Sequence, residues 1–166
     1  MTDHVARVVR QWTKEFPEVD ASPMYVLGRL LRINTQVTKT LVANFAKFGL
    51  ANGDFDVLAT LRRSGEPYAL RPTELSKSSM LTSGTMTSRL DKLEKLGLVC
   101  RSPNPEDRRA LMIYLTDKGR NLVEEVARKH FELEAEVLDT LDPQDRQALE
   151  GILERWCHRL EGDSPA

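Results

Sequence analysis

The sequence lacks a long hydrophobic run. Of its 166 residues, 40% are hydrophobic and 30% are charged, and no apolar stretch approaches the roughly 18 residues that a membrane helix needs. The first twenty residues are polar and amphipathic, so no secretory signal is expected there. We therefore expect a soluble, cytoplasmic globular protein of one domain, or of one domain with helical extensions, and no membrane partner.

Cysteine and histidine are also scarce. Cys100 and Cys157 lie far apart, and the three histidines show no metal-ligand spacing, so no metal site is expected. The sequence contains no nucleophile elbow, phosphate-binding loop or metalloprotease motif. We therefore expect neither an enzyme nor a bound cofactor, and two isolated cysteines favour a reducing compartment.

The chain has almost no net charge, with a formal value of −1. The charges are unevenly distributed, however: residues 62–109 hold 10 basic and 6 acidic side chains, whereas residues 110–166 hold 7 and 13. Phosphate responds to the local electric field and not to the total charge. The basic excess of residues 62–109 therefore favours nucleic-acid binding by that segment.

Apolar residues recur at helical spacing over most of the chain. This periodicity predicts helices over residues 4–16, 23–48, 52–63, 116–141 and 143–160, with a short strand at 68–70.

Residues 72–115 show a short helix, a turn, a second helix and a two-stranded hairpin. Pro72 suits the first position of a helix, and Gly97 suits the position just after one. The second helix has one apolar face, made of Met86, Leu90, Leu93 and Leu96. Residues 111–115 alternate as in a half-buried strand. The order predicts a winged helix-turn-helix core in a mainly α fold with a small β-hairpin wing (α+β).

The opposite, polar face of the second helix suits the major groove of double-stranded DNA. From this helix we predict contacts by Ser83, Thr85, Thr87, Ser88 and Lys92. On the preceding helix, Thr73 and Lys77 are predicted to contact phosphate. The wing carries Arg108 and Arg109, and either arginine can enter the neighbouring minor groove.

The flanking helices carry more apolar surface than the small core can cover. We therefore predict that residues 1–51 and 116–166 are dimerisation helices around a DNA-binding core of residues 52–115. A homodimer also matches a pseudo-palindromic operator, whose two half-sites need two recognition helices. The alternative is that these helices fold back onto their own core.

The stretch LRPTELSKSSMLTSGTMTSRLDKLEKLGLV and the wing PEDRRALMIYLTDKG resemble the MarR (multiple antibiotic resistance regulator) family over nearly the whole chain. The resemblance implies a dimeric winged helix-turn-helix transcriptional regulator, usually a repressor. Winged helices also serve as protein-binding modules, so a protein-interaction module is an alternative. The basic bias of residues 62–109 speaks against that alternative.

A narrower resemblance concerns the strings RQWTKEFPEVDASPM and DFDVLATLRRSGEPYAL, which are similar to the PecS-type, urate-responsive branch of the family. It implies a ligand site formed by Trp12, Asp56, Arg89 and Arg101, with urate or a related planar or phenolic anion as effector. Arginine offers a flat, forked donor face, and an indole can border a planar ligand. A ligand that displaces Arg89, on the recognition helix, lowers DNA affinity by linkage.

Each of these four residues also has a purely structural interpretation. Trp12 can be interface packing, Arg89 can touch phosphate, and Arg101 can pair with a carboxylate. A second way of sensing a signal is through a cysteine. Cys100 adjoins Arg101, whose charge favours a reactive thiolate. A redox-sensing regulator acting through Cys100 is therefore an alternative, although a small strand residue is the simpler interpretation.

Overall fold

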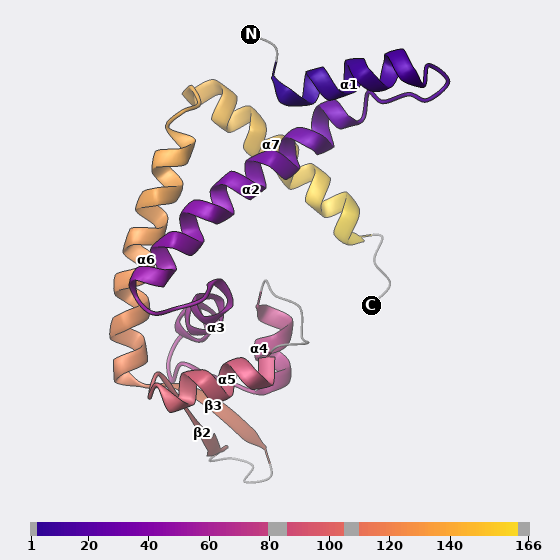
Figure 1. The fold of residues 1–166 in the computed structure, drawn as a ribbon. Coiled ribbons are helices and arrows are strands. Elements are labelled where there is room, and N and C mark those ends of the chain that lie inside the picture. The colour runs from indigo at the N-terminus through magenta and orange to yellow at the C-terminus, as the bar shows by residue number, and fades with distance from the viewer. Residues whose placement is uncertain (1–2, 80–85, 105–109, 163–166) are drawn as a thin grey trace. The chain divides into compact units, whose positions relative to one another are not determined.

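The computed structural model describes residues 3–79, 86–104 and 110–162 (Figure 1). Its elements are α1 (His4–Glu15), α2 (Met24–Lys47), α3 (Asn52–Arg63), β1 (Ala69–Leu70), α4 (Pro72–Ser78), α5 (Met86–Lys95), β2 (Val99–Pro103), β3 (Leu111–Leu115), α6 (Asp117–Leu138) and α7 (Pro143–Gly162). The predicted mainly helical fold with a small hairpin is confirmed. Among the described residues, no helix is long and apolar enough to cross a membrane.

The chain divides into two compact units, residues 1–126 and 127–166. The boundary lies inside α6, because the first turns of that helix bury Val123 and Val126 in the first unit. The three-part functional division at 51/52 and 115/116 stays a prediction.

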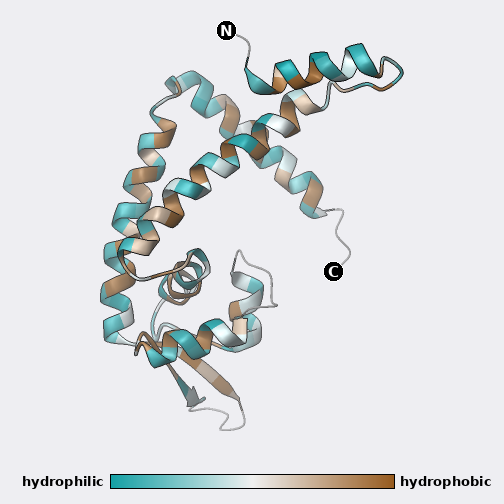
Figure 2. Ribbon diagram, in the orientation of Figure 1, coloured by the Kyte–Doolittle hydropathy of each residue, from teal (hydrophilic) through white to brown (hydrophobic). Residues whose placement is uncertain are grey.

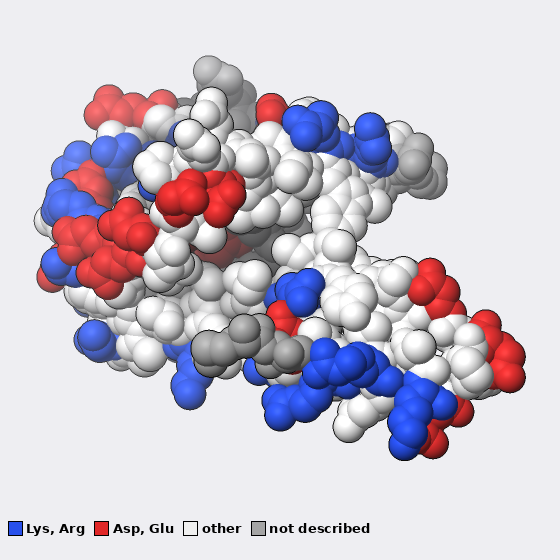
Figure 3. All heavy atoms as spheres, turned by 90° about the horizontal axis from the view of Figure 1, so that it is seen from above, with Lys and Arg blue, Asp and Glu red and all other residues white. Residues whose placement is uncertain are grey.

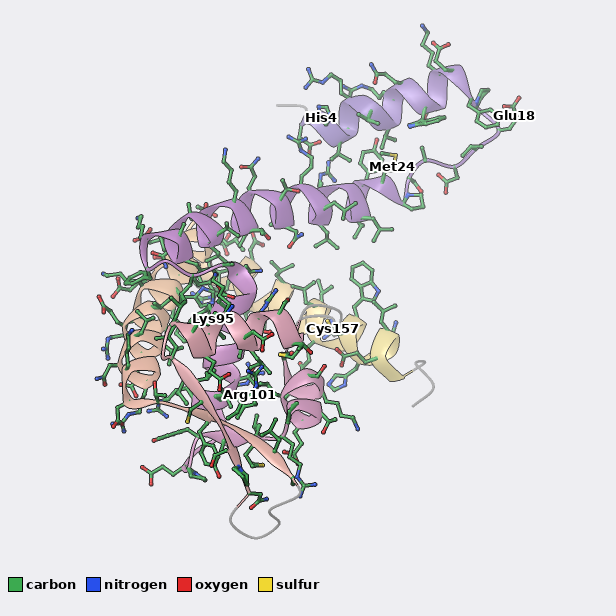
Figure 4. All side chains as sticks on the ribbon, turned by 60° about the horizontal axis from the view of Figure 1, so that its bottom comes forward. His4, Glu18, Met24, Lys95, Arg101 and Cys157 are labelled. Carbon is green, nitrogen blue, oxygen red and sulfur yellow. The ribbon has the colours of Figure 1, made fainter. Side chains whose placement is uncertain are left out.

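In the first unit, α1 is fixed to the beginning of α2. Asp3 caps α1 by accepting a hydrogen bond from the backbone N–H of Ala6 (2.8 Å), and it also accepts one from Arg29 Nε (2.8 Å). The Ala6 bond, followed by the Arg29 bond, holds the pKa of Asp3 below its ordinary value. Gly28 lies so close to Val5 that a Cβ there would be 3.2 Å from a valine methyl group. His4 and Met24 mark these two helix starts in Figure 4.

The core of the first unit lies where α3, α4 and α5 meet the sheet. The rings of Phe45 and Phe55 stack with centroids 4.6 Å apart and join the end of α2 to α3. The fully buried apolar side chains of the three helices and the sheet include Val57, Leu58, Leu61, Leu75, Leu93, Val99 and Ile113. They occupy the positions at which the sequence shows helical or alternating apolar spacing.

The sheet has three antiparallel strands in the order β1-β3-β2. Ala69 and Cys100 are both register partners of Tyr114, so β3 is the central strand. The hairpin is closed near its tip by a hydrogen bond from the Asn104 N–H to the Ala110 carbonyl (2.8 Å). The predicted wing and the predicted short strand are thus confirmed, and the short strand, which spans Ala69–Leu70, pairs with β3.

The start of α6 is attached to the turn that ends α5. Thr116 Oγ1 donates to the Gly97 carbonyl (2.8 Å) and accepts from the Gly119 N–H (3.0 Å), while Lys118 Nζ donates to the Leu96 carbonyl (2.7 Å). A Cβ at Gly119 would lie 2.0 Å from the Leu98 carbonyl oxygen. Only glycine permits this approach of helix to turn.

Several helices expose apolar side chains. In the second unit, α7 has no buried residue among those described. The exposed large apolar residues include Val26, Leu27, Leu31, Ile33 and Val42 on α2, Phe131 on α6, and Leu149, Ile152 and Leu160 on α7. Hydrophobic positions are visible along these helices in Figure 2.

Leu93 and Leu96 give a matched test of the core. Leu93 is fully buried and Leu96, one turn later, is 42% exposed. We expect Leu93→Ala to lower the free energy of unfolding by about 2–5 kcal/mol, because the cavity adds to the lost burial. Leu96→Ala should lower it by about 0.5 kcal/mol or less. Urea unfolding at one fixed protein concentration measures both, and equal effects would contradict this assignment of the core.

Candidate nucleic-acid interface

The helix-turn-helix begins with α4, which is set into the core by the fully buried Leu75. Pro72 takes the first helical position, and Glu74 accepts a hydrogen bond from the backbone N–H of Arg71 (2.9 Å). Thr73 and Lys77, both predicted phosphate contacts, lie exposed on α4.

Helix α5 has an apolar side and a polar side, as Figure 2 shows. Met86, Leu90 and Leu93 are buried. Thr87 and Ser88 are exposed, so these two predicted DNA contacts lie on the accessible surface of the helix. Ser83, Thr85, Arg108 and Arg109, also predicted DNA contacts, lie outside the described residues.

One flank of α5 is tied to the first turn of α3 by an ion pair. Lys92 Nζ lies 2.5 Å from Asp54 Oδ2, and the Asp54 side chain is only 3% exposed. The same oxygen accepts a hydrogen bond from the Ala51 N–H (2.8 Å). Lys92, predicted to contact DNA, therefore has a carboxylate partner within the protein. The sequence alone does not identify Asp54 as this partner, although an acid in a first helical turn is a recognised helix-start signal.

Arg89 lies on the same flank of α5 as Lys92, and its side chain extends toward α3. Its guanidinium lies against Gly53: a Cβ built there would be 1.0 Å from Nη1 and 2.0 Å from Cζ. Arg89 thus extends along the first turn of α3. Asp56, three positions after Gly53 and half-buried, lies one turn further along the same side of that helix.

The opposite flank of α5 carries acids that hold β2. Arg101 Nη2 lies 2.5 Å from Asp91 Oδ1, and Arg101 Nη1 donates to Glu94 Oε2. The backbone N–H of Arg101 also donates to Glu94 (3.1 Å). The hydrogen bond to Asp91, with that to Glu94, raises the pKa of Arg101 above its ordinary value. Figure 4 labels Arg101 below Lys95, the last residue of α5. A carboxylate partner is the structural interpretation of Arg101 in the sequence, but Asp91 and Glu94 are not recognisable there as that partner.

These contacts place Arg89 and Arg101 on different flanks of the recognition helix. Positions 89 and 92 share one side of a helix, whereas 91 and 94 share another. The chain therefore brings Arg89 and Asp56 to one part of α3, and it brings Arg101 to the other flank of α5.

Trp12 is separated from both groups. It is 48% exposed and borders an open hollow of about 270 Å³ lined by Val8, Gln11, Trp12 and Glu15, all from α1. Helix α1 contacts the beginning of α2, whereas α3 follows the end of α2. A 24-residue helix is about 36 Å long, so one chain does not bring its own Trp12 to its own Asp56 in this arrangement.

The surface is mixed in charge. The face shown in Figure 3 carries both basic and acidic side chains with uncharged surface between them. Within the described residues, no group of three potential metal ligands occurs. Cys100 and Cys157 are both exposed and free.

Comparisons with known proteins agree with this architecture. The model of the MarR family matches residues 50–111. The HTH-type transcriptional regulator PecS of Dickeya dadantii (strain 3937) is 39% identical over 151 residues, which is 91% of each chain.

Two solved structures are similar in fold. A MarR mutant from E. coli complexed with operator DNA has a TM-score of 0.67 and 26% identity, covering 87% of this chain and 96% of that one. Bordetella bronchiseptica BpsR, studied for regulation of its DNA binding by 6-hydroxynicotinic acid, has a TM-score of 0.64 and 27% identity, covering 86% and 96%. With its winged helix and its similarity to PecS along nearly the whole length, the chain belongs to the MarR family of DNA-binding transcriptional regulators, which are not enzymes.

Proposed function

We propose that this regulator binds a pseudo-palindromic operator as a homodimer, acts as a repressor in the cytoplasm, and is released by a small planar or phenolic anion such as urate. The observation that supports DNA reading best is the polar side of α5, with Thr87 and Ser88 exposed and both flanks held by ion pairs. A helix fixed in this way presents its side chains to the major groove in one orientation.

The proposal of a homodimer rests on the uncovered apolar helices. Helix α7 is 20 residues long and buries none of them within its own chain, yet it carries Leu149, Ile152 and Leu160. On α2, Leu31 is 67% exposed. A two-fold partner would cover such faces with the same faces of a second copy.

The proposed DNA contacts come from three segments. Thr87 and Ser88 of α5, with Ser83 and Thr85 before it, are proposed to read the major groove; Thr73 and Lys77 of α4 would bond phosphate, and Arg108 or Arg109 of the wing would enter the minor groove. Lys92, the remaining residue predicted to contact DNA, pairs with Asp54 and in this proposal acts by holding α5 against α3.

The proposed effector site is centred on Arg89 and Asp56. An anion attracted to the Arg89 guanidinium would be repelled by the carboxylate of Asp56. The anion would therefore draw Arg89 away from α3. BpsR is a regulator whose DNA binding is regulated by 6-hydroxynicotinic acid, an aromatic acid. Urate shares the planar shape and the negative charge of that acid. Arg101 would join the site only by breaking its ion pair with Asp91 or Glu94 and binding the ligand instead.

Trp12 enters the site from the second copy in this proposal. In its own chain it lies with α1 at the beginning of α2, and Arg29 to Lys47 alone spans about 27 Å of helix. A homodimer would thus hold two ligand sites, each built from both chains.

The dimer is tested by adding one negative charge to an apolar or a polar position of α2. We expect Leu31→Glu to shift the protein from dimer to monomer in analytical ultracentrifugation, because burying an unpaired carboxylate is strongly unfavourable. Gln36→Glu adds the same charge at an exposed polar position and should leave the dimer intact. A monomeric wild-type chain at micromolar concentration would contradict the proposal.

DNA binding is tested with the operator region upstream of the protein's own gene. We expect Lys77→Ala to weaken binding to every duplex and to reduce the slope of log affinity against log salt by about 1 for each phosphate that the lysine neutralises. Ser88→Ala should weaken the operator complex by about 0.5–1.5 kcal/mol, the net contribution of one hydrogen bond, and leave non-specific binding unchanged. Lys39→Ala, on α2, is the control that should change neither. Absence of any specific complex at modest salt would favour the protein-interaction module.

The effector is tested by gel shift with and without urate. We expect urate to dissolve the wild-type complex, and both Arg89→Ala and Trp12→Phe to abolish this response while retaining DNA binding. A heterodimer of one Trp12→Phe chain and one Arg89→Ala chain should keep one intact site and respond partly, since the two residues come from different copies.

The matched control is a heterodimer of wild type with the double variant carrying both substitutions on one chain. It leaves each site with one of the two residues replaced and should not respond. If that control responds and the first heterodimer does not, Trp12 acts within its own chain. A complex indifferent to urate would direct the search to 6-hydroxynicotinic acid and similar anions, or to oxidation of Cys100.

A further inference from the structure

We infer that the first turn of α3 is a seat, made of Gly53 and Asp54, which withholds two positive charges of the recognition helix from DNA. The seat takes the guanidinium of Arg89 and the ammonium of Lys92. The inference rests on the proposed DNA binding by α5 and adds two positioning residues to it.

Gly53 is the part of the seat that admits Arg89. The guanidinium occupies the space that any side chain at position 53 would need, since Nη1, Cζ and Nη2 lie 1.0, 2.0 and 2.5 Å from a Cβ built there. A glycine within a helix lowers helix stability relative to alanine. Its presence in the first turn of α3 has a physical reason in this approach of Arg89 to the backbone.

Asp54 is the part that holds Lys92. Its carboxylate is almost entirely buried and lies 2.5 Å from Lys92 Nζ. A buried carboxylate attracts its cation more strongly than a solvated one does, because water screens the pair less. Lys92 is half-exposed, so its ammonium can face solvent while Asp54 neutralises it.

Both cations are held because the spacings match. Arg89 and Lys92 are three positions apart and share one side of α5, and Gly53 and Asp54 are consecutive in the first turn of α3. Of the three cationic side chains in α5, only Lys95 lies away from this seat. The basic excess counted along residues 62–109 therefore overstates the charge that α5 offers to phosphate.

The seat favours specific over non-specific DNA binding. Phosphate attraction is independent of sequence and supplies most non-specific affinity. A recognition helix whose cations are held by α3 depends more on base contacts by its hydroxyl side chains.

Gly53→Ala tests the seat without removing a charge. Arg89 meets the new methyl group with the far end of a flexible side chain, so the fold should accept alanine by swinging the guanidinium outward. We expect binding to a random-sequence duplex to tighten and the salt slope to steepen by about 0.9 for each released arginine that reaches phosphate, or about 1.8 for a homodimer. Asp54→Asn should steepen the slope likewise by freeing Lys92.

Two controls separate the seat from general effects. Gly53→Ala combined with Arg89→Ala should show no steepening relative to Arg89→Ala alone, because no guanidinium remains to be released. Gly151→Ala in α7 makes the same change beside another arginine, where the nearest atom, Arg155 Nη1, is 3.3 Å from the added Cβ. It should leave the slope unchanged. An unchanged slope in Gly53→Ala, or equal steepening in the double variant, would overturn the inference.

A second readout does not depend on DNA binding. In ¹⁵N spectra of the arginine side chains, the Arg89 Nε–H signal is identified by its loss in Arg89→Ala. We expect a dispersed, slowly exchanging signal in the wild type, and a signal in Gly53→Ala that moves to the position of solvent-exposed arginines. A wild-type signal already at that position would refute the seat, whereas a seated Arg89 in a chain that binds no duplex would refute only the proposed function.

Discussion

The ion pair between Asp54 and Lys92 is the interaction on which the presentation of the recognition helix depends. A carboxylate that is 3% exposed needs a cation, because removing one partner of a buried pair leaves an uncompensated charge that costs about 3–5 kcal/mol. Lys92 is 48% exposed, so water reduces that figure here toward the roughly 1 kcal/mol of a surface pair. The pair nonetheless fixes the direction of α5, since it ties this helix to α3, whose buried side packs in the core.

The two flanks of α5 are held by pairs of opposite polarity. On one flank the helix supplies the cation Lys92 and α3 supplies the acid; on the other it supplies Asp91 and Glu94, and β2 supplies Arg101. A rotation of α5 about its axis would therefore stretch at least one pair. In a chain with a net charge of −1, several charges thus orient elements within the protein, while the exposed side of α5 carries the hydroxyl groups of Thr87 and Ser88.

The sequence sufficed for the elements and the core, because both depend on local rules. Pro72 begins α4, Gly97 takes a positive φ after α5, and the apolar spacing of α5 identifies Leu90 and Leu93 as buried. These features need no knowledge of the neighbouring helices, and the structure confirms them.

The pairing of side chains between elements could not be predicted in the same way. Asp54 and Asp56 are two positions apart in α3, and the rotation of α3 against α5, set by packing of the core, decides which one meets Lys92. Gly53 reads in the sequence as a weak helix residue, since nothing local shows that an arginine 36 positions later lies on it. Trp12 illustrates a further limit: its proposed site lies across two copies, and no pattern within one chain shows that.

The attachment of α6 suggests how a change at α5 would spread in the proposed dimer. The first turn of α6 is bonded to the turn after α5 through Thr116 and Lys118, and Gly119 lies against the Leu98 carbonyl. Arg62 of α3 pairs with Glu124 one turn further along α6 (2.7 Å).

A ligand that draws Arg89 from α3 would weaken the hold on one flank of α5 but not these attachments. The turn after α5 and the first turn of α6 would then shift together, while the Arg62–Glu124 pair keeps α6 attached to α3. Operator half-sites lie about one helical turn of DNA apart, roughly 34–36 Å, so a small rotation at each α6 changes the spacing of two recognition helices. The affinity for a palindrome would fall although each recognition helix kept all of its proposed DNA-contacting side chains.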